Sequence, residues 1–162
     1  MEKFEDYQKY KWFYTSSGKV VIGGKSASQN EELLRKIKSL KEEFIVMHTS
    51  EPGSPFSIIL ADIKELSKPD LNETAIFTGC FSRAWRSGNK KTSVGIFKSS
   101  QLYKNKDMKI GTLGVSWAVK QINVNLELVL TKQLGILRAV PEQSVKNKKN
   151  ILLKISPGKI DK

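Results

Sequence analysis

Two short apolar runs on either side of a Pro-Gly loop constrain the fold of this chain more than any other feature. Residues 44–47 and 56–60 are apolar and partly β-branched, and runs of this length predict two buried strands. The loop between them carries the only histidine, His48, followed by hydroxyl residues, proline and glycine. Since proline fixes φ and the hydroxyls bond local backbone, the loop is expected to hold one shape. Such a rigid loop is a usual place for recognition or chemistry, and the same residues also fit an ordinary solvated turn.

The rest of the pattern predicts a single α+β domain, in which about two helices pack on a mixed, mostly antiparallel sheet. Two short strands around residues 16–18 predict a β-hairpin. Ser28 with Glu31 fits a capping box at the start of one helix. Residues 71–86 predict a second helix, with Asp70 and Glu73 at its start. Further strands are expected at residues 92–97, 101–103, 113–119, 122–130 and 136–140.

Composition divides the chain into three parts. Residues 1–9 form a polar N-terminal extension that is expected to fray, and residues 10–141 form the folded domain. Residues 142–162 form a basic C-terminal tail with six lysines and two acids. An apolar patch at residues 151–155 fits either an added edge strand or a mobile tail.

The net charge of +12 predicts a polyanionic partner. The charge is uneven: residues 81–110 hold eight lysines and arginines against one acid, whereas residues 1–80 are nearly balanced. No amphipathic basic helix accompanies this charge, so nucleic acid is favoured over a membrane surface. The chain shows neither a signal peptide nor a long apolar span, which predicts residence in the cytoplasm.

Groups for catalysis are sparse in this chain. One histidine and one cysteine, Cys80, exclude an internal disulfide and a Cys/His zinc site, and we expect neither a metal nor a cofactor. His48 near Glu51 is the one candidate base with an orienting partner. Two glycines and Lys25 before a helix resemble an anion site, although they lack the spacing of a P-loop.

Four stretches of the chain read KWFYTSSGKVVIGGKSASQNEELL, IVMHTSEPGSPFSII, TGCFSRAW and LGILRAVPE. Together they resemble the NFACT-R domain, the RNA-binding module of NFACT proteins in ribosome-associated quality control. The resemblance covers residues 10–141, nearly the whole folded part. It implies an α+β fold, contact with tRNA or ribosomal RNA, and no catalytic activity within the domain.

The chain departs from the family pattern at several points. Pro55 stands where many members have a second histidine, Phe81 replaces a frequent tyrosine, and the loop is one residue shorter. The large N-terminal portion and coiled coil of the long proteins are not in this sequence, so their tailing and tRNA-recruiting activities are not carried over. The chain resembles a stand-alone NFACT-R protein, a form associated with tRNA modification or translation.

Resemblance and charge together predict an RNA-binding surface around the loop, the helix start and the basic helix end. Its predicted residues are Lys25, Asn30, His48, Thr49, Gly53, Ser54, Ser82, Arg83, Arg86, Lys90, Lys91, Lys98 and Lys104. The aromatic residues Trp12, Phe13, Tyr14, Trp85 and Trp117 are expected to lie mostly in the core.

The leading hypothesis is a non-enzymatic RNA-binding protein that acts on tRNA or ribosomal RNA. The ribosome or a tRNA-modification enzyme would be a further partner, and no membrane is expected. One alternative is an RNA-modifying or RNA-processing enzyme that uses His48. A second alternative is a protein-interaction module whose basic face meets an acidic partner.

Overall fold

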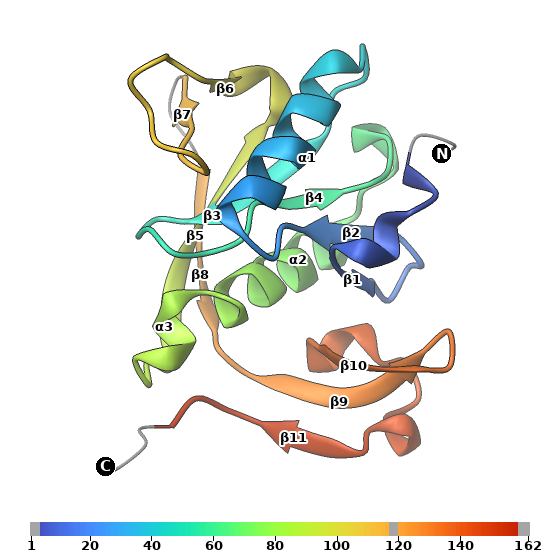
Figure 1. Ribbon diagram of the computed structural model, residues 1–162. Coiled ribbons are helices and arrows are strands. Elements are labelled where there is room, and N and C mark those ends of the chain that lie inside the picture. Colours follow the sequence, from blue (N-terminus) through green and yellow to red (C-terminus); the bar gives the residue numbers. More distant parts are fainter. Residues whose placement is uncertain (1–3, 117–119, 159–162) are drawn as a thin grey trace.

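A six-stranded antiparallel sheet lies at the centre of the computed structural model, which describes residues 4–116 and 120–158 (Figure 1). Its strands are β1 (Lys11–Tyr14), β2 (Val20–Gly23), β3 (Ile45–Thr49), β4 (Ser57–Ile59), β5 (Lys91–Lys98) and β8 (Lys120–Asn125). The order is β1-β2-β4-β3-β5-β8, and every neighbouring pair is antiparallel. The expected hairpin and the expected pair of strands around the Pro-Gly loop are therefore both confirmed.

Both faces of this sheet are buried at β2, β3 and β4, which explains why these strands have short continuous apolar runs. Successive side chains of a strand point to opposite faces. Val46 and Ile58 pair across β3 and β4 and lie in the core on one face. Their neighbours Met47 and Ile59 lie in the core on the other face. All four are fully buried, and each contributes about 1.5–3 kcal/mol of transfer free energy.

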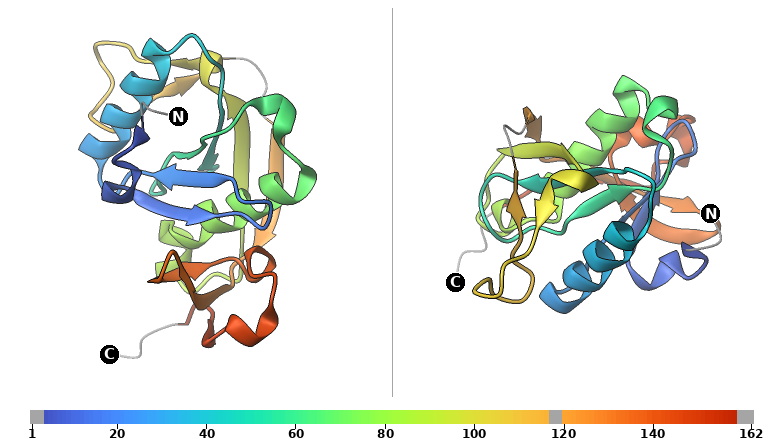
Figure 2. Two further views of the ribbon diagram at one scale, coloured as in Figure 1. Left: turned by 90° about the vertical axis from the view of Figure 1, so that its right-hand side faces the viewer. Right: turned by 90° about the horizontal axis from the view of Figure 1, so that it is seen from above.

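One helix covers each face of the sheet: α1 (Ala27–Ser39) on one side and α2 (Lys68–Cys80) on the other (Figure 2). Helix α1 buries Leu33, Leu34 and Ile37 against the sheet. Its N-cap is Ser26, whose hydroxyl accepts a hydrogen bond from the amide of Gln29 at 3.1 Å. The capping box at Ser28 was therefore wrong, because the chain is already helical at that residue.

Helix α2 starts about one turn earlier than the sequence predicts. Ser67 is its N-cap and forms a capping box with Asp70. Pro69 lies within the first turn, where its missing N–H is not needed. Asp70 and Glu73 are buried and also accept hydrogen bonds from the turn of the β1–β2 hairpin, so they tie the start of α2 to that hairpin.

The predicted helix over residues 71–86 is interrupted after Cys80. A separate short helix, α3 (Arg83–Arg86), begins at Ser82, whose hydroxyl accepts from the amide of Ala84 and donates to the carbonyl of Gly79. A Cβ atom on Gly79 would lie 2.8 Å from the Thr92 side chain. This glycine therefore allows α2 to lie close against β5, as its small residues predicted.

A second, three-stranded sheet packs on the side of α2 that faces away from the large sheet (Figure 2). It consists of β9 (Leu128–Gln133), β10 (Ile136–Val140) and β11 (Leu153–Ile155), in the order β10-β9-β11. The single strand predicted at residues 122–130 is two strands, because the chain leaves the large sheet after β8 and enters this one as β9.

A third, two-stranded sheet is formed by β6 (Leu102–Tyr103) and β7 (Gly114–Val115). The expected strand over residues 113–119 overlaps β7, and its last residues, including Trp117, lie outside the described residues. Of the other expected core aromatics, Trp12 and Phe13 are buried, whereas Tyr14 and Trp85 are half-buried.

Residues beyond both predicted domain boundaries contribute to the packed structure. Phe4 is buried and lies edge-on to Phe44, with ring centroids 6.5 Å apart. Val145 is buried beside α2, and β11 pairs with β9. The edge-strand alternative for residues 151–155 is therefore confirmed, while the division into three functional parts stays a prediction. No helix in the described part of the chain is long and apolar enough to cross a bilayer.

Candidate nucleic-acid interface

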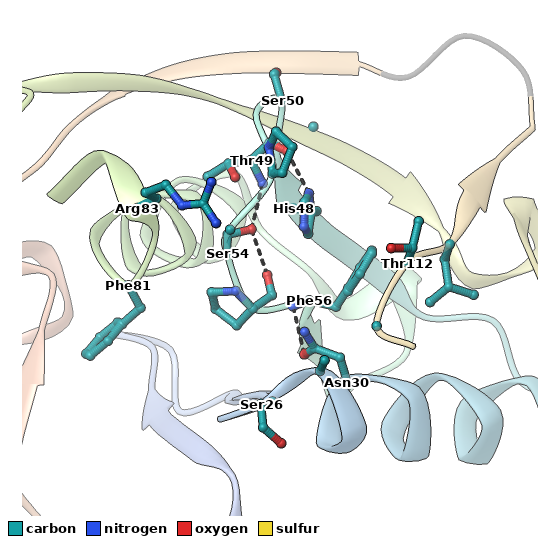
Figure 3. Close-up of a pocket in the computed structure, with 18 of the residues that line it drawn as sticks. Ser26, Asn30, His48, Thr49, Ser50, Ser54, Phe56, Phe81, Arg83 and Thr112 are labelled. Carbon is teal, nitrogen blue, oxygen red and sulfur yellow. Dashed lines mark hydrogen bonds between the residues drawn. The ribbon is translucent and has the colours of Figure 1, made fainter. Parts of the chain in front are cut away.

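A cleft of about 830 Å³ brings together four segments that are distant in the sequence (Figure 3). They are the start of α1, the β3–β4 loop, the α2–α3 corner and the loop that precedes β7, and residues of β1, β5 and β8 complete the lining. Predicted residues that line this cleft are Lys25, Asn30, His48, Thr49, Gly53, Ser54, Arg83 and Arg86. Most of the surface expected from the sequence is therefore one continuous site.

The β3–β4 loop is held by its own side chains. The amide of Thr49 donates to the hydroxyl of Ser54 at 3.0 Å, and the Thr49 hydroxyl donates to the carbonyl of Glu51 at 2.6 Å. Ser54 in turn donates to the carbonyl of Pro55 at 3.1 Å. Gly53 has φ of +98°, a conformation that glycine adopts at little cost. These contacts give the loop the single shape that its composition predicts.

Helix α3 is attached to this loop through its first residue. The amide of Arg83 donates to the carbonyl oxygen of Gly53 at 2.8 Å. A Cβ atom on Gly53 would lie 3.0 Å from Nε of Arg83. The glycine therefore leaves room for the arginine side chain, which lies along the loop at the rim of the cleft (Figure 3).

His48 lies in the cleft as a neutral hydrogen-bond acceptor. Its ring packs on Phe56, with centroids 4.4 Å apart, and its Nδ1 lies 2.6 Å from the carbonyl oxygen of Thr49. A carbonyl only accepts hydrogen bonds, so Nδ1 carries the proton and Nε2 of the neutral ring does not. Burial lowers the pKa of His48 more than the Thr49 carbonyl raises it. At neutral pH the ring is thus uncharged, with Nε2 as an acceptor.

Asn30 supports the floor of the cleft from inside α1. The side chain is buried, and its oxygen accepts a hydrogen bond from the amide of Phe56 at 3.3 Å. A Cβ atom on Gly24 would come within 2.2 Å of this same oxygen. Asn30 therefore fixes the end of the β3–β4 loop against the helix.

Four cationic side chains line the cleft: Lys11, Lys25, Arg83 and Arg86. Among the described residues no carboxylate lines it. Burial lowers the pKa of Lys11, and the positive charges of Arg86 and Lys25, which line the same cleft, lower it further. The Lys11 ammonium also lies 4.9 Å from the centre of the Phe81 ring.

The sequence did not single out Lys11. It is the first residue of β1 and its neighbour Trp12 is buried, so strand alternation places Lys11 on the opposite side. Alternation along β1 therefore predicts the side of the strand on which Lys11 lies. The sequence does not show that α3 lies on that side.

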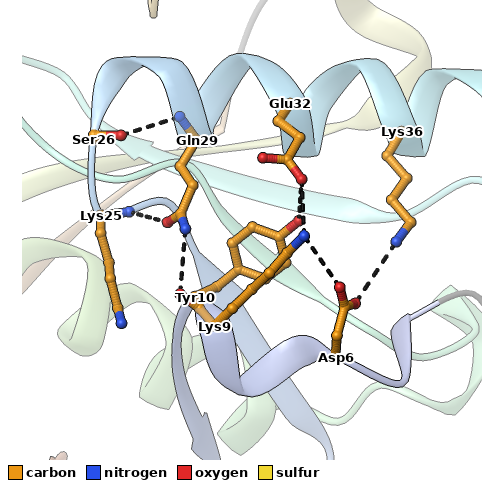
Figure 4. A network of polar contacts seen from close by, with 8 residues as sticks. All are labelled: Asp6, Lys9, Tyr10, Lys25, Ser26, Gln29, Glu32 and Lys36. Atoms are coloured by element: carbon orange, nitrogen blue, oxygen red, sulfur yellow. Dashed lines mark hydrogen bonds and ion pairs between the residues drawn. The ribbon is translucent and has the colours of Figure 1, made fainter.

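Lys25 forms no ion pair within the described part of the chain, in contrast to Lys9 near the start of α1. Lys9 pairs with Asp6 and Glu32 at 3.1 and 3.0 Å. The backbone amide of Lys25 donates to the Gln29 side chain at 2.8 Å, while its ammonium points away from the network (Figure 4).

The remaining predicted residues either lie away from the cleft or form contacts within the protein. Ser82 is buried and caps α3. Lys90 and Lys91 are exposed beyond α3, outside the cleft lining. Lys98 lines a different groove, near Phe44 and Leu60. Lys104 pairs with Glu31 and donates to the carbonyl of Thr112 at 2.8 Å, so it holds the loop before β7 against α1.

An α+β protein with a basic, carboxylate-free cleft belongs to the class of anion-binding modules, of which nucleic-acid-binding domains are a large group. A family model described as the NFACT protein RNA binding domain matches residues 9–116. The chain therefore belongs to this family, and the resemblance seen in the sequence is confirmed.

Two individual proteins are similar to this chain. The archaeal Rqc2 homolog aRqcH of Methanocaldococcus jannaschii is 38% identical over 82 residues, which cover 51% of this chain and 12% of that protein. A solved structure, the C-terminal part of the fibronectin/fibrinogen-binding protein from Streptococcus suis, has a TM-score of 0.63 at 19% identity. It covers 72% of this chain and 45% of that one, and at this identity the similarity concerns the fold alone.

Proposed function

We propose that this protein is a non-enzymatic RNA-binding protein whose cleft contacts the phosphates of tRNA or ribosomal RNA. The observation that carries the proposal is the convergence of Lys11, Lys25, Arg83 and Arg86 in a cleft without a carboxylate. Membership of an RNA-binding family supports it. By extension from the family and the archaeal Rqc2 homolog, we propose that the protein acts in ribosome-associated quality control. A role in translation more widely or in tRNA modification stays a prediction from the sequence.

Phosphate contacts of this kind make the affinity depend on salt. Each neutralised phosphate contributes about −0.7 to −0.9 to the slope of log K against log salt concentration. The four cations come from β1, the β2–α1 loop and α3. A ligand that contacts all four therefore bridges elements that the fold holds in fixed positions.

A matched pair of double variants tests the site. Lys11→Gln with Arg86→Gln removes two cations from the cleft, and Lys90→Gln with Lys91→Gln removes two exposed cations outside it. The cleft variant should weaken binding to a structured tRNA, with a slope shallower by about 1.4 to 1.8. The outer variant should change the slope by less than half of that. The proposal would be contradicted if both variants changed the slope equally, or if the cleft variant bound tRNA with the affinity and slope of the wild type.

The enzymatic alternative rests on His48, and the cleft gives it little support. Its Nδ1 is bound to a backbone carbonyl rather than to a carboxylate, and no described carboxylate lines the cleft to assist it. We expect RNA to remain chemically unaltered after long incubation with the protein, as measured by mass spectrometry. A product that disappears in His48→Ala would establish the enzyme.

The ribosome or a tRNA-modification enzyme as a partner, and residence in the cytoplasm, stay predictions from the sequence. The second alternative, an acidic protein partner, would use the same cations. Competition between tRNA and an acidic polypeptide such as polyglutamate at physiological salt separates the two cases. A protein that prefers polyglutamate to tRNA of equal charge would favour the interaction module.

A further inference from the structure

We propose that the cleft accepts one unpaired nucleotide of the RNA, with its base at an apolar end and its phosphates at the cationic end. This inference rests on the proposed function and names the structural class of RNA that the site selects. It rests on the difference between the cationic and apolar ends of the cleft, and on the neutral His48 ring, whose Nε2 accepts hydrogen bonds.

The two ends of the cleft differ in chemistry. Arg83 and Phe81 lie at one end, while Thr112 and the loop before β7 lie at the other (Figure 3). At that second end the lining is apolar, with Ile110, Leu113 and Val115 from the loop and β7. Phosphates favour the first end, and an unstacked base favours an apolar wall like the second.

The apolar wall is fixed to the rest of the protein. Lys104 pairs with Glu31 of α1 at one side of the loop. Gly111, with φ of +83°, lies so close to α1 that an added Cβ would be 2.6 Å from Cβ of Ala27. Ile110, between these anchors, is 66% exposed. An exposed apolar side chain on an anchored loop is a contact surface that exists before the ligand binds.

His48 lies between the two ends (Figure 3). Its Nε2 accepts hydrogen bonds at neutral pH, because Nδ1 donates to the Thr49 carbonyl. A phosphodiester has no proton to donate. A ligand group that bonds to this Nε2 is therefore an N–H of a base or a hydroxyl of a ribose. In a nucleotide the ribose lies between the phosphate and the base, as His48 lies between the two ends of the cleft.

A regular duplex does not satisfy this arrangement. Its bases are stacked and paired, so placing one in the cleft requires extrusion at a cost of a few kcal/mol. A bulged, looped or terminal nucleotide is already unstacked and avoids most of that cost. The volume of about 830 Å³ lies within the range of sites that enclose a small ligand.

The test compares three blunt-ended RNA duplexes of closely matched length and charge: one fully paired, one with a single bulged nucleotide, and one with an abasic residue at the bulge. The bulged duplex should bind about tenfold more tightly than the other two, since burying one face of a base against apolar side chains contributes a gain of this order. Equal affinity for all three would overturn the inference and leave the proposed function intact. Failure to bind any of them would overturn both.

Ile110→Asn should remove most of the preference for the bulged duplex over the fully paired one. The matched control is Leu152→Asn, which changes a leucine of similar exposure, 62%, outside the cleft. If Ile110→Asn retains the tenfold preference, or if Leu152→Asn loses it equally, the base does not lie at the apolar end.

Discussion

The backbone amide of Arg83 donates a hydrogen bond to the carbonyl oxygen of Gly53 at 2.8 Å. This contact joins the Pro-Gly loop of the central strands to the first residue of α3. The loop and the basic helix end are separate motifs in the sequence, and this bond makes them two walls of one cleft. The position of the arginine therefore depends on the backbone of the loop.

Gly53→Ala should destabilise the protein and weaken RNA binding together. The residue has φ of +98°, and the added Cβ would lie 3.0 to 3.1 Å from Nε and Cβ of Arg83. The backbone conformation costs about 1–2 kcal/mol for alanine, and the arginine side chain must shift. Urea unfolding and RNA titration of the same variant measure both effects.

Gly18→Ala is the control for that variant. Gly18 has a similar φ of +85°, but nothing lies within 4 Å of the added Cβ. It should lose a similar amount of stability and keep its RNA affinity. If both glycine variants bind RNA equally well, the contact between the loop and Arg83 is not needed for the site.

The stability of the fold should fall in acid as Asp70 becomes protonated. Burial alone would raise the pKa of Asp70, but hydrogen bonds from Ser17, Ser67 and Thr15 outweigh it and lower the pKa to about 2. The folded pKa is below the unfolded value of about 3.9, so the contribution is fully present above pH 4 and is lost as the pH falls towards 2. Its size is about 2 kcal/mol on the same relation.

Asp70→Asn tests this contribution. Both Asp70 oxygens accept hydrogen bonds, so an amide NH₂ leaves donors without an acceptor, at a cost of about 1–3 kcal/mol. The variant should be less stable at pH 7 and should lose stability less steeply between pH 4 and 2. Glu65→Gln, at an exposed position, should match the wild type in urea unfolding at both pH values.

Ile155→Asn should lower the thermal midpoint because β11 is part of the packed structure. Ile155 pairs with Leu128 across β9 and packs, half-buried, against the core beside α2. Loss of this contact should cost about 1–2 kcal/mol. Leu153→Asn, on the same strand but 56% exposed, should stay within about 0.5 kcal/mol. A midpoint that is unchanged in Ile155→Asn would mean that residues 142–162 act as a mobile tail after all.

The thiol of Cys80 should be unreactive in the native protein. Burial raises the pKa of Cys80 to about 12, and the thiolate is the nucleophile in disulfide exchange. At pH 8 a thiol-reactive disulfide reagent should label native Cys80 only as fast as the core around α2 opens. Labelling in denaturant should be fast. Native labelling as fast as that of a free thiol would show that the α2 core is open.

Local patterns in the sequence determined the parts of the fold that do not depend on distant partners. The paired strands around the loop, the hairpin of residues 11–22 and the buried face of α1 all follow from short-range apolar periodicity and turn residues. The single shape of the loop that contains His48 and Gly53 was expected from its residue types. Residue types and spacing were enough for these features.

Tertiary structure alone decided which charges line the cleft. Lys11 joins the cleft because β1 begins beside Phe81 at the α2–α3 corner, whereas Lys104 forms an ion pair with Glu31. Ser82 became a helix cap because α2 ends where it packs closest to β5 and β8. Charge count and helix propensity are properties of single residues and short windows, but the partner of a charge and the end of a helix depend on contacts between segments far apart in the chain.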